Sequence, residues 1–132
     1  MKVAIYGQYY LNSTEPIIKD IFVFFNKNNV EMIIEEHFLD MLYDKKIVQK
    51  EYKTFSSHAE LDSTFDMMIS IGGDGTILRA ATLVRNSGIP ILGVNAGRLG
   101  FLASVPKENI DTFLQYVIDK KYTLSPRTLL SI

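Results

Sequence analysis

The chain has 132 residues, which is enough for one compact domain with its own core and leaves little room for a second. It contains no cysteine, which excludes disulfides, thiolate metal sites and thiol nucleophiles. The 14 Lys and Arg residues nearly balance 15 Asp and Glu residues, and the sequence has no basic block of the kind that binds a nucleic-acid duplex. The longest aliphatic and aromatic run, residues 21–25, is far shorter than a membrane span of about 20 residues. We therefore expect a cytoplasmic protein that binds neither nucleic acid nor membrane.

The first part of the chain predicts a strand, a helix and a second strand. Residues 2–6 are the first strand, and a helix follows that Ser13 or Thr14 can cap and whose first turn tolerates Pro16. Residues 30–34 predict the second strand. The apolar stripe of the helix has the spacing of one helix face and consists of Ile17, Ile18, Ile21, Phe22 and Phe25.

Residues 36–66 have the weakest pattern in the chain. The part from 37 to 43 fits a helix, whereas residues 45–65 mix charged residues with Ser and Thr without a period. We interpret this part as a mobile connection over the edge of the sheet. His37 and His58 are isolated and lack metal-ligand spacing, so we interpret both as surface or packing residues and expect no metal site built from them. Glu35, Glu36 and Asp40 are interpreted as a solvated face.

The pattern becomes clear again at residues 67–71, an apolar run that predicts a buried strand. A helix over 76–86 and a strand over 89–94 follow. Pro106 opens another helix, with an apolar face made of Ile110, Phe113, Leu114, Val117 and Ile118, and residues 122–132 are predicted to be extended. Strands that alternate with helices in this way indicate an α/β fold of three layers, in which a mostly parallel sheet carries helices on both faces.

A glycine-rich turn, Gly-Gly-Asp-Gly-Thr at residues 72–76, joins a predicted strand to a predicted helix. Open α/β sheets bind their ligands beyond the carboxyl ends of the strands, which is where this turn lies. Gly72, Gly73 and Gly75 let backbone N–H groups approach a phosphate without interference from a Cβ atom, and the start of the helix adds N–H donors and a positive dipole end. The turn therefore predicts a phosphate-binding site.

Asp74 would repel a phosphate, so its place among the glycines calls for a chemical role. It can accept a proton from an attacking hydroxyl or hold a magnesium ion through water, and both roles suit phosphoryl transfer. The alternative is a tight turn in which Asp74 or Thr76 only caps the helix. Arg79, one turn further, either reaches a ligand phosphate or is solvated. The turn is not a P-loop, because it lacks the Lys-Ser or Lys-Thr pair, and Leu78 replaces the third glycine of a dinucleotide fingerprint.

A second glycine loop follows the strand over 89–94, at the same predicted edge of the sheet. Asn95 offers both a donor and an acceptor to a ribose or to the backbone. Gly97 and Gly100 leave room for a ligand, and Phe101 could present its ring to an adenine. The alternative is an ordinary loop in which Phe101 packs into the core.

Taken together, the two segments resemble the NAD kinase family. The first motif is also found in phosphofructokinases and in lipid kinases, and the second motif, Asn-x-Gly-x-Leu-Gly-Phe-Leu at residues 95–102 with Leu99 at its centre, narrows the resemblance. The resemblance implies the N-terminal fold shared by phosphofructokinases and NAD kinases. It also implies ATP-dependent phosphorylation of the adenosine ribose 2′-hydroxyl of NAD to NADP, with a divalent metal ion, Mg²⁺.

The resemblance further implies a role for each matching position. Asp74 would be the catalytic residue that accepts the proton of the 2′-hydroxyl, and Phe101 would lie against the adenine. Asn95 would support the second loop, and Arg79 matches a helix position that often contacts a ligand. The residues implied in nucleotide binding are Gly72, Gly73, Gly75, Thr76, Arg79, Asn95, Gly97, Leu99, Gly100 and Phe101.

Members of this family continue into a second, β-rich domain, and residues 126–130 resemble the crossing into it. We therefore predict an α/β nucleotide-binding domain over 1–125 and the start of a truncated C-terminal β-rich domain over 126–132. The resemblance implies a homo-oligomer for the full-length protein, and the isolated chain is expected to fold without turning over. Two other functions stay open: a Gly-Gly-Asp-Gly-type lipid kinase, which the lack of a basic amphipathic helix disfavours, and a non-catalytic nucleotide-binding domain, which leaves Asp74 unexplained.

Overall fold

The computed structural model describes residues 1–8 and 14–95, together with residues 112, 114, 115, 118, 119, 123, 124, 130 and 131. Within these residues, strands and helices alternate along the chain. The elements of the main body are β1 (Lys2–Gly7), α1 (Thr14–Lys27), β2 (Glu31–Glu35), α2 (Glu36–Asp44), β3 (Lys53–Phe55), β4 (Met67–Gly72), α3 (Asp74–Val84) and β5 (Ile91–Asn95). A single 3-10 turn, His58–Glu60, lies between β3 and β4.

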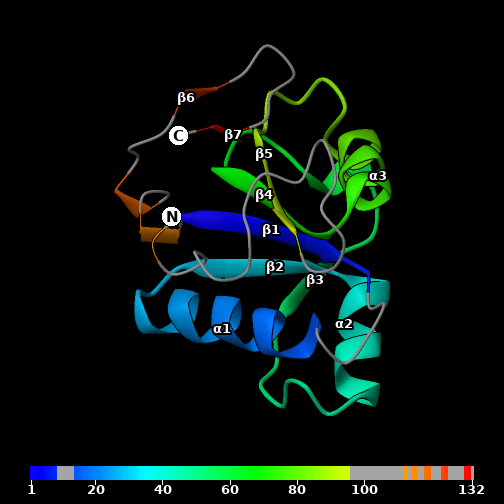
Figure 1. The fold of residues 1–132 in the computed structure, drawn as a ribbon. Helices are drawn as coiled ribbons and strands as arrows, with labels where there is room; N and C mark the ends of the chain where they lie inside the picture. Colours follow the sequence, from blue (N-terminus) through cyan, green and yellow to red (C-terminus); the bar gives the residue numbers. More distant parts are fainter. Residues whose placement is uncertain are drawn as a thin grey trace.

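The five strands of the main body form one parallel sheet in the order β3-β2-β1-β4-β5 (Figure 1). The chain runs outward from β1 to β2 and β3, then returns to the other side of β1 and runs outward again through β4 and β5. The direction of winding thus changes between the two neighbouring central strands, β1 and β4. In open α/β sheets, this change marks the crevice where ligands bind.

Two apolar clusters, one on each face of the sheet, form the core. One cluster joins Ile5, Ile34 and Ile69 to α1 and α2, and the other joins residues such as Ala4 and Met68 to α3. Strands buried on both faces explain why their sequences are continuously apolar instead of alternating. The prediction of a three-layer α/β fold with helices on both faces is confirmed.

Helix α1 follows its sequence pattern closely. The predicted stripe from Ile17 to Phe25 is buried against the sheet, whereas Val23, which lies outside the stripe, is 65% exposed. Asn29 ends the helix with a positive φ of 58°, a conformation that asparagine tolerates, and the N–H of Val30 donates to the carbonyl of Phe25.

The interpretation of residues 45–65 as a connection is wrong at its centre. Lys53–Phe55 is the edge strand β3, which pairs in parallel with β2. Phe55 is almost completely buried in the core on the α3 side, together with Leu61 and Phe65. These apolar residues are too far apart in the sequence to show a period, so the pattern alone did not reveal that they pack together. The helix expected over 37–43 is present as α2.

The described residues between 112 and 131 agree with the elements predicted for that part of the chain. Residues 112, 114, 115 and 118 are helical, within the helix expected after Pro106, and Leu114 is buried in the core beside α1 and α2. Strands β6 (Thr123–Leu124) and β7 (Leu130–Ser131) pair antiparallel as a separate ribbon. They lie on either side of the boundary predicted between residues 125 and 126, which stays a prediction. No helix in the described part of the chain is both long and apolar enough to span a bilayer.

Candidate functional site

The glycine turn lies at the carboxyl end of the central strand β4, beside the point where the winding direction changes. Gly72 is the last residue of β4, Gly73 occupies the N-cap position of α3, and Asp74 is the first residue of that helix. The N–H of Ile77 donates to the carbonyl of Gly73 at 3.2 Å, which closes the first helical turn. The strand therefore passes into the helix without an intervening loop.

Gly72 is the glycine that the fold itself requires. Its φ is +155°, and a Cβ atom placed on it would lie 2.3 Å from Oγ1 of Thr76. Gly73 and Gly75 differ, because a Cβ atom on either would meet no atom of the described residues within 4 Å. The backbone on this side of the turn is therefore open to approach, and the first turn of α3 directs N–H groups and the positive end of the helix dipole there. Such an arrangement suits a phosphate or another anion.

Thr76 ties the turn to the loop that follows β1. Its side chain is fully buried, and its Oγ1 donates a hydrogen bond of 3.0 Å to Oε1 of Gln8. Gln8 directly follows β1, and its own N–H donates to the carbonyl of Ile71 in β4. The idea that Thr76 caps the helix is therefore wrong, because Gly73 occupies the cap position and the Thr76 side chain joins α3 to the residue that follows β1. Sequence reasoning did not single out Gln8, and the available signal was its place at the carboxyl end of the first strand.

The first motif lies beside the first residue of the second motif at this edge of the sheet. Asn95 ends β5, and its Cα is paired in register with that of Gly72 at the end of β4. Arg79 lies on the exposed side of α3. The side chains of Asp74 and Asn95 lie outside the described part of the structure, as do all atoms of the remaining predicted residues, Gly97, Leu99, Gly100 and Phe101. The structure thus brings the glycine turn next to the start of the second loop.

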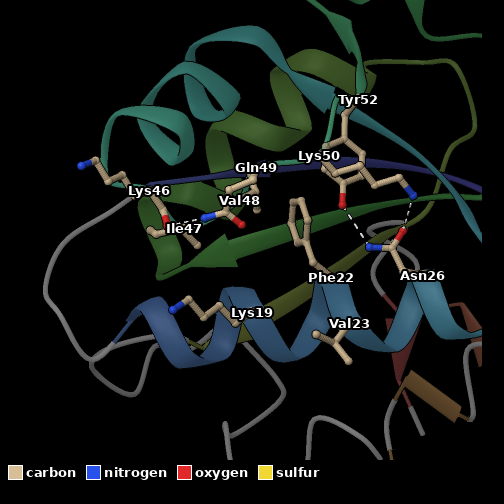
Figure 2. Close-up of a pocket in the computed structure, with 10 residues that line it drawn as sticks. All are labelled: Lys19, Phe22, Val23, Asn26, Lys46, Ile47, Val48, Gln49, Lys50 and Tyr52. Carbon is tan, nitrogen blue, oxygen red and sulfur yellow. Dashed lines mark hydrogen bonds between the residues drawn. The ribbon is translucent and has the colours of Figure 1, made fainter.

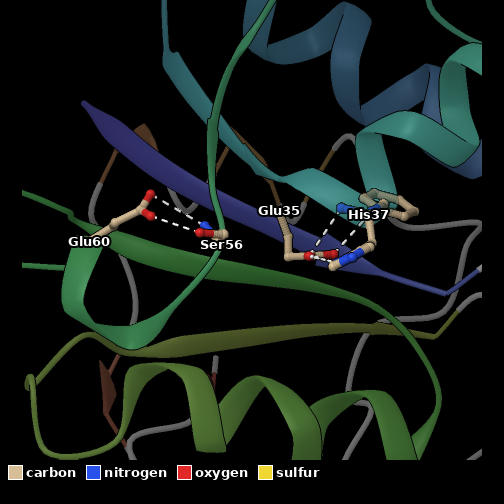
Figure 3. A network of polar contacts seen from close by, with 5 residues as sticks. Glu35, His37, Ser56 and Glu60 are labelled. Atoms are coloured by element: carbon tan, nitrogen blue, oxygen red, sulfur yellow. Dashed lines mark hydrogen bonds and ion pairs between the residues drawn. The ribbon is translucent and has the colours of Figure 1, made fainter.

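Glu35 has a structural role that the sequence interpretation missed. It was interpreted as part of a solvated face, but it is 6% exposed, whereas Glu36 and Asp40 are exposed as expected. Its carboxylate caps α2 by accepting a hydrogen bond of 3.0 Å from the N–H of His37 (Figure 3) and another of 3.0 Å from the N–H of Phe38. It also contacts Nδ1 of His37 at 2.9 Å. This hydrogen bond and the charge of Glu35 raise the pKa of His37, whose side chain is exposed as predicted.

Packing around Gly7 shows how close α2 lies to this edge. A Cβ atom on Gly7 would lie 2.8 Å from Cζ of Phe38, so the absence of a side chain makes room for the phenylalanine ring. Phe38 in turn is held by the cap that Glu35 provides. Both oxygens of Glu35 are therefore used to fix α2.

The described residues contain no group of three or more His, Cys, Asp or Glu side chains that could hold a metal ion. Magnesium is usually bound by one or two carboxylates together with phosphate oxygens and water, so a dedicated cluster is not required for it.

Comparison with known proteins agrees with this geometry. Residues 11–122 match the family described as the ATP-NAD kinase N-terminal domain. The chain belongs to this family. It is 73% identical to the NAD kinase of Flavobacterium johnsoniae and 62% identical to that of Flavobacterium psychrophilum, in each case over all of this chain and 45% of the relative. The NAD kinase of Bacteroides fragilis is 38% identical over the same shares. The chain therefore spans less than half the length of these relatives.

A solved structure supports the fold. The crystal structure of yeast NADH kinase complexed with NADH superposes with a TM-score of 0.76 and covers 92% of this chain and 36% of the yeast chain. The sequence identity is 19%, so this likeness concerns the fold alone.

Proposed function

We propose that this chain is the nucleotide-binding part of an NAD kinase, which transfers a phosphoryl group from ATP to the 2′-hydroxyl of the adenosine ribose of NAD and gives NADP. The observation that supports the proposal is the pairing of Gly72 with Asn95, which puts the first motif beside the first residue of the second motif at the carboxyl edge. That edge lies where the winding direction changes, the position at which α/β sheets bind nucleotides. Family membership and the names of the relatives support the same reaction.

In this reaction the 2′-oxygen of NAD attacks the γ-phosphorus of ATP, and the bond from that phosphorus to the oxygen of the leaving ADP breaks. We assign to Asp74 the role of accepting the proton that leaves the 2′-hydroxyl. The assignment is supported by the position of Asp74 in the first turn of α3, where backbone N–H groups suit a phosphate. An ordinary carboxylate is a weak base, so the proton moves late, after bonding to phosphorus has acidified the hydroxyl.

The remaining assignments concern binding. The backbone of Gly72, Gly73, Gly75 and Thr76 lines the nucleotide phosphates, and Arg79 contacts the ligand from the exposed side of α3. The second loop is assigned to NAD, with Asn95 supporting the loop, Phe101 against the adenine, and Gly97, Leu99 and Gly100 shaping the space between them. A magnesium ion that accompanies the ATP phosphates supplies charge neutralisation when it is bound.

A substitution at Asp74 tests this assignment in the intact protein that contains residues 1–132. ATP-dependent formation of NADP is measured enzymatically for the parent and for Asp74→Asn, and NAD binding is measured by calorimetry. We expect turnover to fall by about 10²-fold or more while NAD still binds, because the amide keeps the shape but cannot accept the proton. The matched control is Asp20→Asn, an exposed aspartate on α1, which should turn over like the parent.

The outcomes separate the competing functions. Unchanged turnover in Asp74→Asn would refute the proposed role of this carboxylate. Turnover on a lipid but not on NAD would favour the lipid kinase, and nucleotide binding without turnover on either acceptor would favour a non-catalytic domain. We also propose that the isolated chain does not turn over, because a second domain completes the site, that the full-length protein is a homo-oligomer, and that it works in the cytoplasm. Detectable NADP formation by the isolated chain would contradict the first of these.

A further inference from the structure

A groove lies between α1 and the segment that joins α2 to β3, and nothing in the proposed reaction uses it (Figure 2). Its volume is about 380 Å³. The groove is on the opposite side of the sheet from α3 and reaches the amino edge of the strands, because Asn26 lies near the end of α1 and Tyr52 directly precedes β3. The glycine turn lies at the carboxyl edge, so a ligand in this groove would not occupy the nucleotide site.

The floor of the groove is apolar. Phe22, Ile47 and Val48 form it, and the exposed side chain of Val23 extends the apolar surface along α1. Small-molecule sites in proteins have volumes of about 300–1,000 Å³ and are lined mainly by apolar side chains with a few polar groups. The size and lining of this groove both match that description.

The rim of the groove is positively charged. Three lysines line it, Lys19, Lys46 and Lys50, and the described lining residues include no aspartate or glutamate. This excess contrasts with the whole chain, whose formal net charge is −1. Glu15 pairs with Lys19 at 3.4 Å from one helical turn away, but an exposed pair of this kind is weak and leaves the lysine available.

Lys50 is held by neutral hydrogen-bond and ring partners. Nζ of Lys50 donates to Oδ1 of Asn26 at 3.1 Å and lies 5.6 Å from the centre of the Tyr52 ring. Nδ2 of Asn26 donates in turn to the hydroxyl of Tyr52 at 3.0 Å. These neutral partners hold Lys50 at the groove, although the lysine also lines an adjoining hollow that Glu31 and Glu51 border.

The walls of the groove are preformed. The Tyr43 hydroxyl donates to the carbonyl of Lys50, and Nε2 of Gln49 donates to the carbonyl of Lys46, each at 3.0 Å. The rings of Phe22 and Tyr52 meet edge to face with centroids 5.3 Å apart, which joins α1 to the opposite wall. Binding of a ligand would therefore cost little free energy for ordering this surface.

We propose that this groove binds a small organic anion. An aromatic or branched apolar body would lie on Phe22, Ile47 and Val48, and a carboxylate, sulfonate or phosphate head would lie at the lysine rim. The ligand class follows from three features that occur together: a preformed wall, an apolar floor of suitable size, and a cationic rim without carboxylates among its lining residues. The proposal is independent of the reaction assigned to the glycine turn.

The test uses 8-anilinonaphthalene-1-sulfonate, which combines an apolar aromatic body with one anionic group, on the intact protein that contains residues 1–132. Binding is measured by fluorescence titration, and its place is mapped from amide chemical shifts in nitrogen-15 NMR spectra. We expect one saturable site whose shifts fall on α1 and on residues 46–52, and saturating NAD or ATP should not displace the probe. The neutral analogue N-phenyl-1-naphthylamine should bind at least tenfold more weakly.

Two sets of variants make the result specific. Lys46→Gln combined with Lys50→Gln should weaken binding at least tenfold, and Val23→Asp, which changes an exposed side chain, should do the same. Lys27→Gln combined with Lys45→Gln is the matched control, because both lysines are exposed and neither lines the groove. It should bind within about twofold of the parent, and all variants should keep the circular dichroism spectrum of the parent. Unchanged affinity in the Lys46 and Lys50 variant, or shifts centred on residues 72–76, would overturn the proposal.

Discussion

Replacing Gly72 with alanine is expected to destabilise the fold through a single defined contact. The added Cβ atom would lie 2.3 Å from Oγ1 of Thr76 and 2.8 Å from its Cβ, well inside the 3.0 Å limit for real Cβ contacts. The Thr76 side chain cannot move aside freely, because it is fully buried and donates a hydrogen bond to Gln8. In addition, the φ of +155° at Gly72 is one that residues with side chains rarely adopt.

The size of the effect follows from these two contributions. A residue held in a sparsely populated backbone region costs about 1–3 kcal/mol. Forcing an extra carbon into a packed site costs about 1–3 kcal/mol more. Alanine restricts the unfolded chain more than glycine does, which returns about 0.4–1 kcal/mol. We therefore expect Gly72→Ala to lower the free energy of unfolding by roughly 1–5 kcal/mol, against the about 5–15 kcal/mol typical of a domain.

Equilibrium unfolding in urea, followed by circular dichroism, measures this change, and the slope of the transition should stay the same. Gly75→Ala is the matched control, because its Cβ atom meets nothing within 4 Å in the part of the chain that the structure describes and its position is helical. Alanine there should leave stability unchanged or raise it by up to about 1 kcal/mol. The reasoning would be refuted if Gly72→Ala unfolded within about 0.5 kcal/mol of the parent, or if Gly75→Ala lost as much stability as Gly72→Ala.

Three further substitutions and one titration test other parts of the structure. Ser70→Ala should keep or slightly raise stability, because its buried Oγ has no hydrogen-bond partner in the described part of the protein, and a loss above about 1 kcal/mol in urea would contradict this. Glu35→Ala should cost about 1–2 kcal/mol by removing the cap of α2, and an unchanged melting temperature would argue against the cap. Phe25→Ala should cost about 3–5 kcal/mol in the same urea experiment, because its side chain is completely buried, and a cost below about 1 kcal/mol would contradict that packing. The pKa of His37, followed by NMR, should lie above its ordinary value of about 6.5 and fall in Glu35→Gln, since the Glu35 carboxylate raises it. Because the raised pKa belongs to the folded state, His37 stabilises the fold below its unfolded pKa, and this contribution is lost as the pH rises through the folded pKa.

Sequence patterns predicted those elements that are buried on both sides. The strands β1, β2, β4 and β5 are nearly continuous apolar runs, which is the pattern expected of parallel strands between two helical layers. Strand β3 escaped prediction because it is short and lies at the edge. Of its three residues, Lys53 and Thr54 are exposed and only Phe55 is buried, so no period can be seen in the sequence. Its place is fixed by pairing with β2, which is a property of the folded chain.

Site residues that act through their own backbone were predicted from the sequence. Contacts between residues far apart in the sequence were not. The glycines at 72–76 act through their own backbone, so the sequence was sufficient to find them. The bond from Thr76 to Gln8 joins residues 68 positions apart, and no local pattern reports it. The interpretation of Glu35 as a solvated residue is wrong for a similar reason. Glutamate is not among the usual helix-capping residues, and it stands beside the exposed Glu36, so its role became clear only from the bonds to His37 and Phe38.

The glycine turn at residues 72–76 is expected to be rigid because of its position at the carboxyl end of the central strands. Strands β1 and β4 are the two neighbouring strands between which the winding changes, and each has a partner on both sides, so neither can shift alone. Gly72 packs closely against the Thr76 side chain, and Thr76 is hydrogen-bonded to Gln8, which directly follows β1. These two contacts couple the turn to both central strands. A phosphoryl-transfer site depends mainly on donors that are already in position when charge develops, because donors that must reorganise cost free energy at that moment. Gly72→Ala should therefore lower the stability of the fold and displace the N-terminus of α3. Alanine at Gly73 or Gly75 should leave the fold intact and affect only what approaches the open side of the turn.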